Sequence, residues 1–179
     1  TVVETASGET RDVPLSDGSI GSAGAQSMLW ATLTRVSREV TLARGVAFFR
    51  LAKDPARAFM VKDGTTSVPA VGTAFNVRRA GERVVVGVAE GTVKVDVQAH
   101  QQRTVVRTAR LTVGQQLSID GADGSASIQV VDASGVAAWR EGLRQYRNEP
   151  LRSVVAVLTR YSARAIVIAN PQVAELRIT

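Results

Sequence analysis

The stretch from Val40 to Arg79 constrains the fold more than any other part of the sequence. Apolar and polar side chains alternate along much of it, which is the two-residue period of a half-buried strand, and no helical period is present. All four phenylalanines of the chain lie in it: Phe48, Phe49, Phe59 and Phe75. The stretch therefore predicts the β core around which the remaining strands are organised.

Short breaks divide this stretch into strands. Arg44-Gly45 predicts a glycine turn between two strands, and Lys53-Asp54-Pro55 ends the second strand because proline has no N–H to donate. Gly72 marks a bend or a close approach of two backbones. A pattern of strand, glycine turn and strand recurs at irregular spacing around Gly18, Gly45, Gly91 and Gly114. This pattern predicts stacked β-hairpins in a roll or sandwich.

The composition agrees with a mainly β protein. Of the 179 residues, 45% are hydrophobic but only 4% are aromatic, so valine, leucine, isoleucine and alanine must fill most of the core. The chain has no cysteine, which excludes a disulfide framework and thiolate ligands for a metal. No apolar run reaches the ~20 residues that span a bilayer, and no signal segment opens the chain. We expect a targeting element to lie upstream.

The residue pattern changes near Asp132. Asp132 or Ser134 can cap a short helix, and Gly142 is a candidate for its end. We therefore expect two units, an all-β domain over residues 1–132 and a small α+β unit over residues 133–179.

The smaller unit has the pattern of a strand, a helix and a strand. Leu143–Arg147 alternate as a short strand, and Asn148 is a candidate cap for a helix with Pro150 in its first turn. Further strands are expected at Ala165–Ala169 and Leu176–Thr179. One face of the helix is apolar at the spacing i, i+3, i+4, i+7 and i+10, and it comprises Leu151, Val154, Val155, Leu158 and Tyr161.

No residue pattern points to catalysis, and we expect no cofactor and no metal. The single histidine, His100, lies in a polar loop without a carboxylate cluster beside it. No nucleophile lies in a Gly-x-Ser-x-Gly context. Gly87–Gly91 lies between two strands and lacks the helix N-terminus that a phosphate would need. An enzyme would require a polar cluster at one end of the sheet that sequence spacing does not reveal.

The charge of the chain is positive and uneven. The formal net charge is +6, and residues 133–179, with seven arginines and three glutamates, carry +4 of it. Such a surface is either a solvated face or one that favours an acidic partner. A nucleic acid is disfavoured because the basic residues are scattered singly and are not interleaved with exposed aromatics.

Four motifs in the first half of the chain follow one another in order. They are Leu15-x-Asp17-Gly18-Ser19, Gly45-x-Ala47-Phe48-Phe49, Ala52-Lys53-Asp54-Pro55-x-Arg57-x-Phe59 and Val71-Gly72-Thr73-x-Phe75-Asn76-Val77-Arg78. This series resembles the periplasmic half of FecR-type transmembrane sigma-factor regulators, which are anti-sigma factors. The family usually continues after the first motif with a strand, but residues 20–27 are rich in glycine, and their pairing stays open.

A second block of motifs lies in the last third of the chain. It comprises Ala138-Trp139-Arg140-x-Gly142, Pro150-Leu151-x-x-Val154 and Arg160-Tyr161-Ser162. This block resembles the short domain at the start of secretins and of TonB-dependent receptors. The resemblance implies that a further helix and strand of that domain would follow Thr179.

The resemblance also implies a function. It implies a non-catalytic periplasmic domain, anchored to the inner membrane in the full-length protein by a helix outside this sequence. Such a domain binds the N-terminal signalling domain of a siderophore-type, TonB-dependent outer-membrane receptor. It thereby controls an extracytoplasmic-function sigma factor, which is held by a cytoplasmic segment also outside this sequence.

The predicted partner surface lies in the smaller unit. A β-α-β unit with missing elements exposes strand edges and part of an apolar helix face, and aromatic and arginine side chains are typical interface anchors. The predicted contact residues are Leu143, Tyr146, Arg147, Leu151, Val155, Leu158, Tyr161, Ile166 and Ile168.

Two alternatives stay open. Trp139, Tyr146 and Tyr161 can instead pack between the two units. The chain can also be a carbohydrate- or surface-binding β module, for which Trp30 is the candidate aromatic platform and would have to be exposed.

Overall fold

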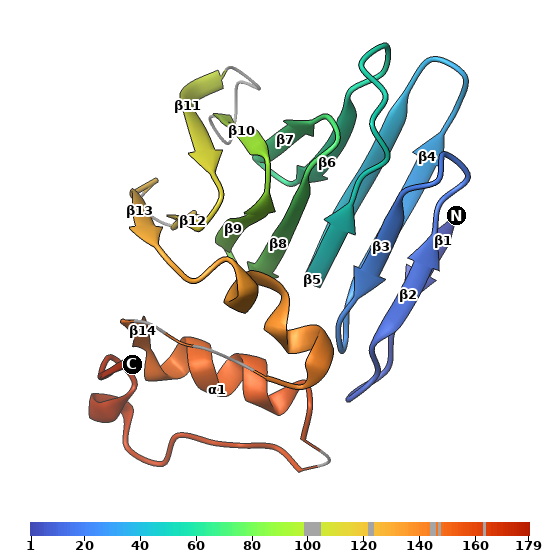
Figure 1. Ribbon diagram of the computed structural model, residues 1–179. Coiled ribbons are helices and arrows are strands. Elements are labelled where there is room, and N and C mark those ends of the chain that lie inside the picture. The colour runs from blue at the N-terminus through green and yellow to red at the C-terminus, as the bar shows by residue number, and fades with distance from the viewer. Residues whose placement is uncertain (99–104, 122–123, 144–145, 147, 163) are drawn as a thin grey trace.

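The longest strand, β5 (Arg38–Arg50), connects the two halves of the β-sheet in the computed structural model (Figure 1). Its first part lies between β4 (Met28–Leu33), which is antiparallel to it, and β6 (Phe59–Asp63), which is parallel to it. Its second part lies between β3 (Ile20–Ala23) and β8 (Ala74–Ala80), both antiparallel. β5 therefore belongs to both halves. The structure describes residues 1–98, 105–121, 124–143, 146, 148–162 and 164–179.

Gly45 marks the point at which β5 changes partners. Its φ of 94° lies in the left-handed region that favours glycine, and a Cβ there would overlap the Ser27 hydroxyl and lie 2.5 Å from Ser27 Cα. The predicted turn at Arg44-Gly45 is wrong, because the strand continues through both residues. The glycine instead allows the strand to bend from one half of the sheet into the other.

Among the residues that the structure describes, each half of the sheet contains seven strands when β5 is counted in both. The first half contains β1 (Val2–Glu4), β4, β5, β6, β7 (Thr66–Ala70), β10 (Thr92–Gln98) and β11 (Val105–Thr112). The second half contains β2 (Arg11–Pro14), β3, β5, β8, β9 (Arg83–Glu90), β12 (Gln115–Ile119) and β13 (Ala126–Val130).

A single apolar core is built from both halves of the curled sheet. At its centre the ring of Phe49 lies 5.6 Å from the rings of Phe59 and Phe75, so β5, β6 and β8 meet there. Valine dominates the remainder of this buried cluster. The prediction of a mainly β fold with a valine-rich core and a small α+β unit is confirmed.

The predicted hairpins are only partly correct. The turn at Gly18 does join two paired strands, β2 and β3. At Gly91 and Gly114 the chain instead leaves one half of the sheet for the other, because β9 pairs with β8 and β12 whereas β10 pairs with β7 and β11. Both glycines have positive φ, of 80° and 75°. They therefore form corners between the halves rather than hairpin turns.

The glycine-rich segment after Gly18 forms a strand. β3 pairs with β2 on one side and with β5 on the other. The Cβ position of Gly21 faces the Phe49 ring at 3.6 Å, so the missing side chain lets the ring pack against the backbone.

The tail, defined here as residues 133–179, begins with a 3₁₀ helix, η1 (Ser134–Glu141). It ends at Gly142, whose φ of 80° gives a left-handed C-cap, and this confirms the predicted helix and its end. The main helix, α1, covers Leu151–Thr159. Among the described residues no helix has the length and apolar character needed to cross a membrane.

The rest of the tail follows the prediction only in part, since the strand expected at Leu176–Thr179 is present as β15 (Arg177–Ile178). Asn148 is not a helix cap: its φ is 53°, and Pro150, with extended backbone, precedes α1. No strand forms at Ala165–Ala169. The two-stranded pair consists instead of β14 (Glu149–Pro150) and β15 (Arg177–Ile178), with η2 (Pro171–Val173) before β15.

Candidate functional site

The tail lies against one end of the sheet, with η1 in contact with β8 and β9 (Figure 1). Trp139 holds η1 there, since its indole Nε1 donates to Asn76 Oδ1 at 2.8 Å. The guanidinium of Arg140 lies 5.0 Å from the ring centre of Phe48 on β5, which is a cation–π contact. Trp139 is thus a packing residue at the seam, the name used here for the boundary between sheet and tail.

Gly24 provides the space in which two aromatic side chains of the tail reach the sheet. A Cβ at Gly24 would lie 2.5 Å from Val46 Cγ1, 2.6 Å from the Tyr161 hydroxyl oxygen and 3.0 Å from the Trp139 ring. The Tyr161 hydroxyl accepts a hydrogen bond from the backbone N–H of Ala25 at 3.1 Å. Tyr161 therefore packs at the seam.

Arg160 connects the end of α1 to the first residues of the chain. Its carbonyl oxygen accepts from the Gly8 backbone N–H and from the Ser7 hydroxyl, each at 2.9 Å. Its guanidinium donates to the Arg79 carbonyl oxygen at 3.3 Å. Burial, together with the charge of nearby Arg78, lowers the pKa of Arg160. The seam therefore brings the positive charges of Arg160 and Arg78 close together.

Glu149 is the acidic residue that faces this charge. It is buried at the start of β14, with 4% of the residue exposed. Arg78 approaches one of its carboxylate oxygens at 3.2 Å and Arg83 the other at 3.3 Å. Removing the carboxylate would leave two partly buried guanidinium groups facing each other, so this contact holds the tail onto β8 and β9.

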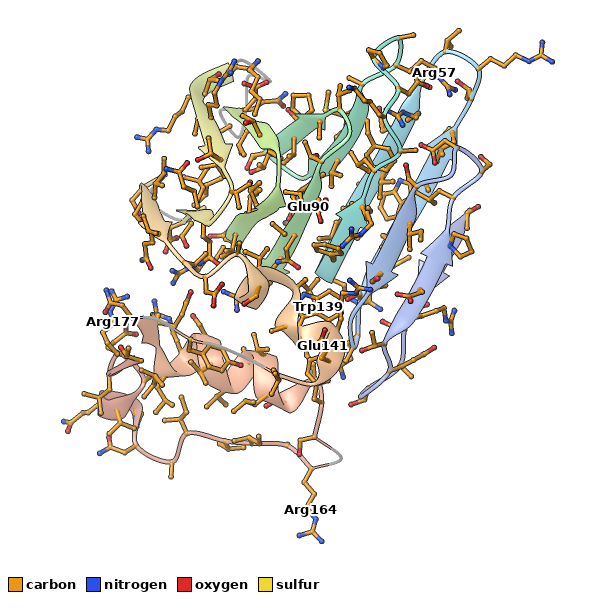
Figure 2. The ribbon with its side chains drawn as sticks, in the orientation of Figure 1. Arg57, Glu90, Trp139, Glu141, Arg164 and Arg177 are labelled. Carbon is orange, nitrogen blue, oxygen red and sulfur yellow. The ribbon has the colours of Figure 1, made fainter. Side chains whose placement is uncertain are left out.

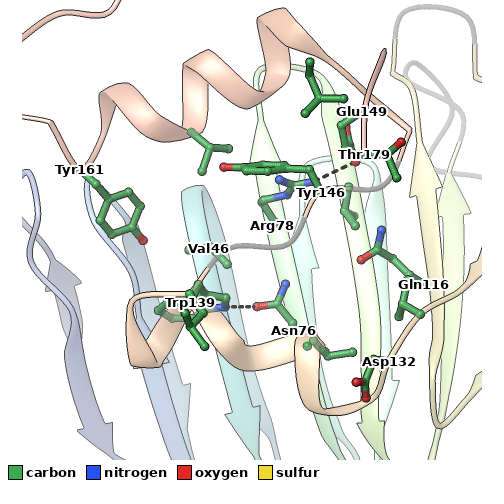
Figure 3. A pocket seen from close by; sticks show the side chains of 17 residues that line it. Val46, Asn76, Arg78, Gln116, Asp132, Trp139, Tyr146, Glu149, Tyr161 and Thr179 are labelled. Atoms are coloured by element: carbon green, nitrogen blue, oxygen red, sulfur yellow. Dashed lines mark hydrogen bonds and ion pairs between the residues drawn. The ribbon is translucent and has the colours of Figure 1, made fainter.

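A cavity of about 630 Å³ lies at the seam (Figure 3). Asn76 and Arg78 line it from β8, Trp139 from η1, and Glu149 from β14. The remaining lining residues are Val46, Val85, Gln116, Val131, Asp132, Gly135, Val136, Leu143, Tyr146, Val157, Tyr161, Ile178 and Thr179. Apolar side chains and a few convergent polar groups are the usual lining of a ligand site.

Five large apolar side chains of the tail are exposed among charged and polar ones. Ile166 is 41% and Leu158 37% exposed, and Val167 reaches 79%. Leu143 is 60% and Leu176 57% exposed at other points of the tail. These five residues are called here the apolar tail residues. Exposed apolar side chains that lie together, as the neighbours Ile166 and Val167 do, are a feature of interaction surfaces.

The predicted contact residues lie in different surroundings. Leu143, Leu158 and Ile166 are exposed, and Leu143 also lines the cavity together with Tyr146 and Tyr161. Leu151, Val155 and Ile168 are half-buried, and Arg147 lies outside the described residues.

Sequence reasoning missed two exposed residues and one buried one. Val167 and Leu176 fall in segments expected to be strands, and their exposure follows from the absence of a strand at one position and its brevity at the other. Val157 is a buried residue of α1, although the predicted apolar face omitted it. A helical wheel that included i+6 would have found it.

The alternative functions depend on other residues. Trp30 is 40% exposed on β4, so the exposed aromatic ring that a surface-binding β module requires is present. His100 lies outside the described residues. Within the part of the chain that the structure describes, no three histidine, cysteine, aspartate or glutamate residues are grouped as metal ligands would be.

A sheet curled around one core and closed at one end by a helical tail also occurs in solved structures. Two crystal structures of a candidate anti-sigma factor from Parabacteroides distasonis ATCC 8503 share it. One, at 1.65 Å resolution, has a TM-score of 0.81 and 27% identity over 89% of this chain and 74% of that chain. The other, at 2.50 Å, has a TM-score of 0.80 and 28% identity over 90% and 74%. No curated protein matches the chain.

The family is defined by a match in sequence. The model of the FecR protein family matches residues 1–94, which is more than half of the chain. The chain belongs to the FecR protein family, and the resemblance inferred from its motifs is confirmed. Members of this family are membrane-anchored regulators with periplasmic domains, and the class is regulatory and non-enzymatic.

Proposed function

We propose that this chain is the periplasmic signal-receiving part of an inner-membrane anti-sigma regulator. It binds the N-terminal signalling domain of a TonB-dependent outer-membrane receptor of the siderophore type. In the full-length protein this binding controls an extracytoplasmic-function sigma factor held on the cytoplasmic side. Membership of the FecR family and the likeness to a candidate anti-sigma factor support the regulatory part of this proposal.

The exposure of the apolar tail residues carries the placement of the receptor contact. Val167 and Ile166 are neighbours in sequence, and both are exposed, at 79% and 41%. The arginine excess of the tail adds a positive field that would speed the approach of an acidic partner. The receptor domain would cover these apolar side chains, while the arginines around them would orient it.

We further propose that residues 1–132 and 133–179 act as two units that meet at the seam. Polar contacts made by Trp139, Glu149 and Arg160 hold the tail on the sheet. Because these contacts are few, a partner can replace them with its own, and this supports the division into two units. A partner that binds better to a repositioned tail would shift the population toward it. That shift is the signal passed toward the membrane.

The test is a titration with the cognate receptor's signalling domain, followed by calorimetry and by backbone NMR. Val167→Glu should weaken binding at least tenfold, because it places a charge in an apolar contact. Val36→Glu is the matched control. Val36 is 85% exposed in the hairpin beside Arg57, which lies at the far end of the molecule from Arg164 of the tail (Figure 2).

Val36→Glu should leave the affinity unchanged. Chemical-shift changes should concentrate in residues 133–179. Changes confined to residues 1–130, or an equal loss of affinity in both variants, would refute this placement of the receptor contact.

The exposed Trp30 supports a second candidate, a carbohydrate- or surface-binding β module. In that case a glycan array would give a specific signal that Trp30→Ala abolishes. The receptor domain would then fail to bind the unchanged protein.

A further inference from the structure

The cavity at the seam is open to solvent and has the size of a ligand site. Its volume of about 630 Å³ lies in the range of small-molecule sites, roughly 300–1,000 Å³. The chemistry of its lining then decides which occupant it fits.

The electrostatics of the cavity favour an anion. Arg78 lines the cavity and shares the single carboxylate of Glu149 with Arg83. The side chains of the two arginines are 19% and 21% exposed, so water screens them only partly. Arg160, whose pKa is lowered by burial and by the charge of Arg78, lies beside the lining and adds a further positive charge. Asp132 also lines the cavity, but it is exposed to water, which screens its charge. Three guanidinium groups in and beside the lining therefore face two carboxylates, which leaves an excess of one positive charge.

Other residues of the lining are apolar or aromatic. Trp139 presents its ring, with the indole nitrogen already engaged by Asn76 (Figure 3). Val46, Val85 and Val136 add aliphatic surface. A ligand that matches both parts has an apolar or aromatic body and one carboxylate at its end.

We propose that the seam cavity binds a small carboxylate with an aromatic or aliphatic body. Its carboxylate pairs with Arg78, and its body packs on Trp139 and the valines. The occupied cavity joins sheet and tail, so the ligand stabilises the docked tail. Leu143 is an apolar tail residue that also lines the cavity, but Val167, at which the receptor contact is tested, does not, and the inference does not depend on that contact.

The two tryptophans of the chain make the test direct. Trp139 lines the cavity, whereas Trp30 lies on β4, so Trp30→Phe leaves Trp139 as the single tryptophan, which can be excited selectively over the tyrosines. The full chain with this substitution is titrated with 3-phenylpropanoate and, as the neutral match, with 3-phenylpropanamide. The acid should give a saturable change in Trp139 emission, and the amide should bind at least about tenfold more weakly.

Three further variants in the same background locate the site. Arg78→Gln should weaken binding of the acid about tenfold or more, while Arg35→Gln, an exposed arginine in the hairpin of Val36, should not change it. Val131→Phe fills the cavity from its lining and should abolish binding without removing a charge. Circular dichroism checks that each variant is folded. If Arg78→Gln does not fold, Val131→Phe still tests the site.

Several results would overturn the proposal. They are the absence of a saturable change with the acid, equal affinity for acid and amide, and binding that survives Val131→Phe in a folded protein. If neither probe binds but the receptor's signalling domain alters Trp139 emission, the cavity takes a protein side chain instead, and the proposal is likewise wrong.

Discussion

The guanidinium of Arg38 is fully buried and pairs with Asp17, with Arg38 Nη1 2.9 Å from Asp17 Oδ2. Arg38 also donates to the carbonyl oxygens of Ala52 at 3.1 Å, Asp54 at 3.4 Å and Arg57 at 2.9 Å. Two motifs of the sequence, the one around Asp17 and the one around Asp54, thus meet at a single buried side chain. Burial acts to raise the pKa of Asp17, but hydrogen bonds from Ser19 and Arg38 outweigh it and lower the pKa.

The first prediction concerns this pair. Arg38→Met should destabilise the protein by about 3–5 kcal/mol, because it leaves the Asp17 carboxylate buried without its cation. Urea unfolding of the single variants and of Asp17→Asn/Arg38→Met measures the coupling. The double variant should lose clearly less stability than the sum of the single variants, and simple additivity would show that the two residues act independently.

The second prediction concerns Asp63, whose carboxylate pairs with Arg79 at 2.5 Å. Burial raises its pKa to about 6, and the attraction of Arg79 only partly offsets this. Between about pH 4 and pH 6, Asp63 of the folded protein therefore keeps a proton that the unfolded chain has already released. This contribution to stability is full below pH 4 and is lost as the pH rises through 6.

Asp63→Asn removes the titration while preserving the shape of the side chain. The wild type should lose up to about 3 kcal/mol relative to this variant between pH 4 and pH 7, and the two should respond alike below pH 4. Urea unfolding at half-unit pH steps gives the difference curve. A flat curve would mean that the Asp63 carboxylate is solvated in the folded state.

The third prediction concerns the bend of β5. Gly45→Ala should destabilise the protein by more than about 3 kcal/mol, because it combines a left-handed backbone with a collision against Ser27. Gly81→Ala is the matched control, since Gly81 has a φ of 62° and no atom within 4 Å of its Cβ position. Its loss should be about 1–2 kcal/mol, the backbone cost alone. Equal losses in thermal unfolding would contradict a steric role for Gly45.

The fourth prediction concerns the seam. Gly24→Ala should push Trp139 and Tyr161 away from the sheet, because its Cβ would lie within 3.0 Å of both side chains. In the Trp30→Phe background the Trp139 emission should shift to longer wavelength, and protease should cut the tail sooner. Gly21→Ala, which meets Phe49 at an ordinary 3.6 Å, should leave both readouts close to those of the parent. An unchanged Trp139 emission in Gly24→Ala would show that the seam tolerates the methyl group.

The sequence by itself determined the kinds of element and the approximate strand positions. Alternation between Val40 and Arg79 predicted strands because a pleated backbone turns successive side chains to opposite faces. Gly142 ended a helix as predicted, since the left-handed cap is a local property of glycine. The ordered motifs were also sufficient to find the FecR family.

Only the tertiary structure decided which strands are neighbours and which charges are buried. Gly91 and Gly114 have the same local signal as the hairpin at Gly18, yet the chain changes halves there, because pairing depends on strands distant in sequence. The sequence pattern did not single out Arg38, the first residue of β5, but the fold buries it among Asp17, Arg57 and Phe59.

The same reason separates the two predicted tyrosines from the exposed apolar residues of the tail. Helical periodicity groups Tyr161 with Leu158, but it does not say against which surface a helix packs. Gly24, far away in sequence, opens the space that Tyr161 occupies, and Leu158 stays 37% exposed on the outside. The position of a residue in a helical or strand period depends only on its neighbours in sequence. Its environment depends on every element that the fold brings next to it.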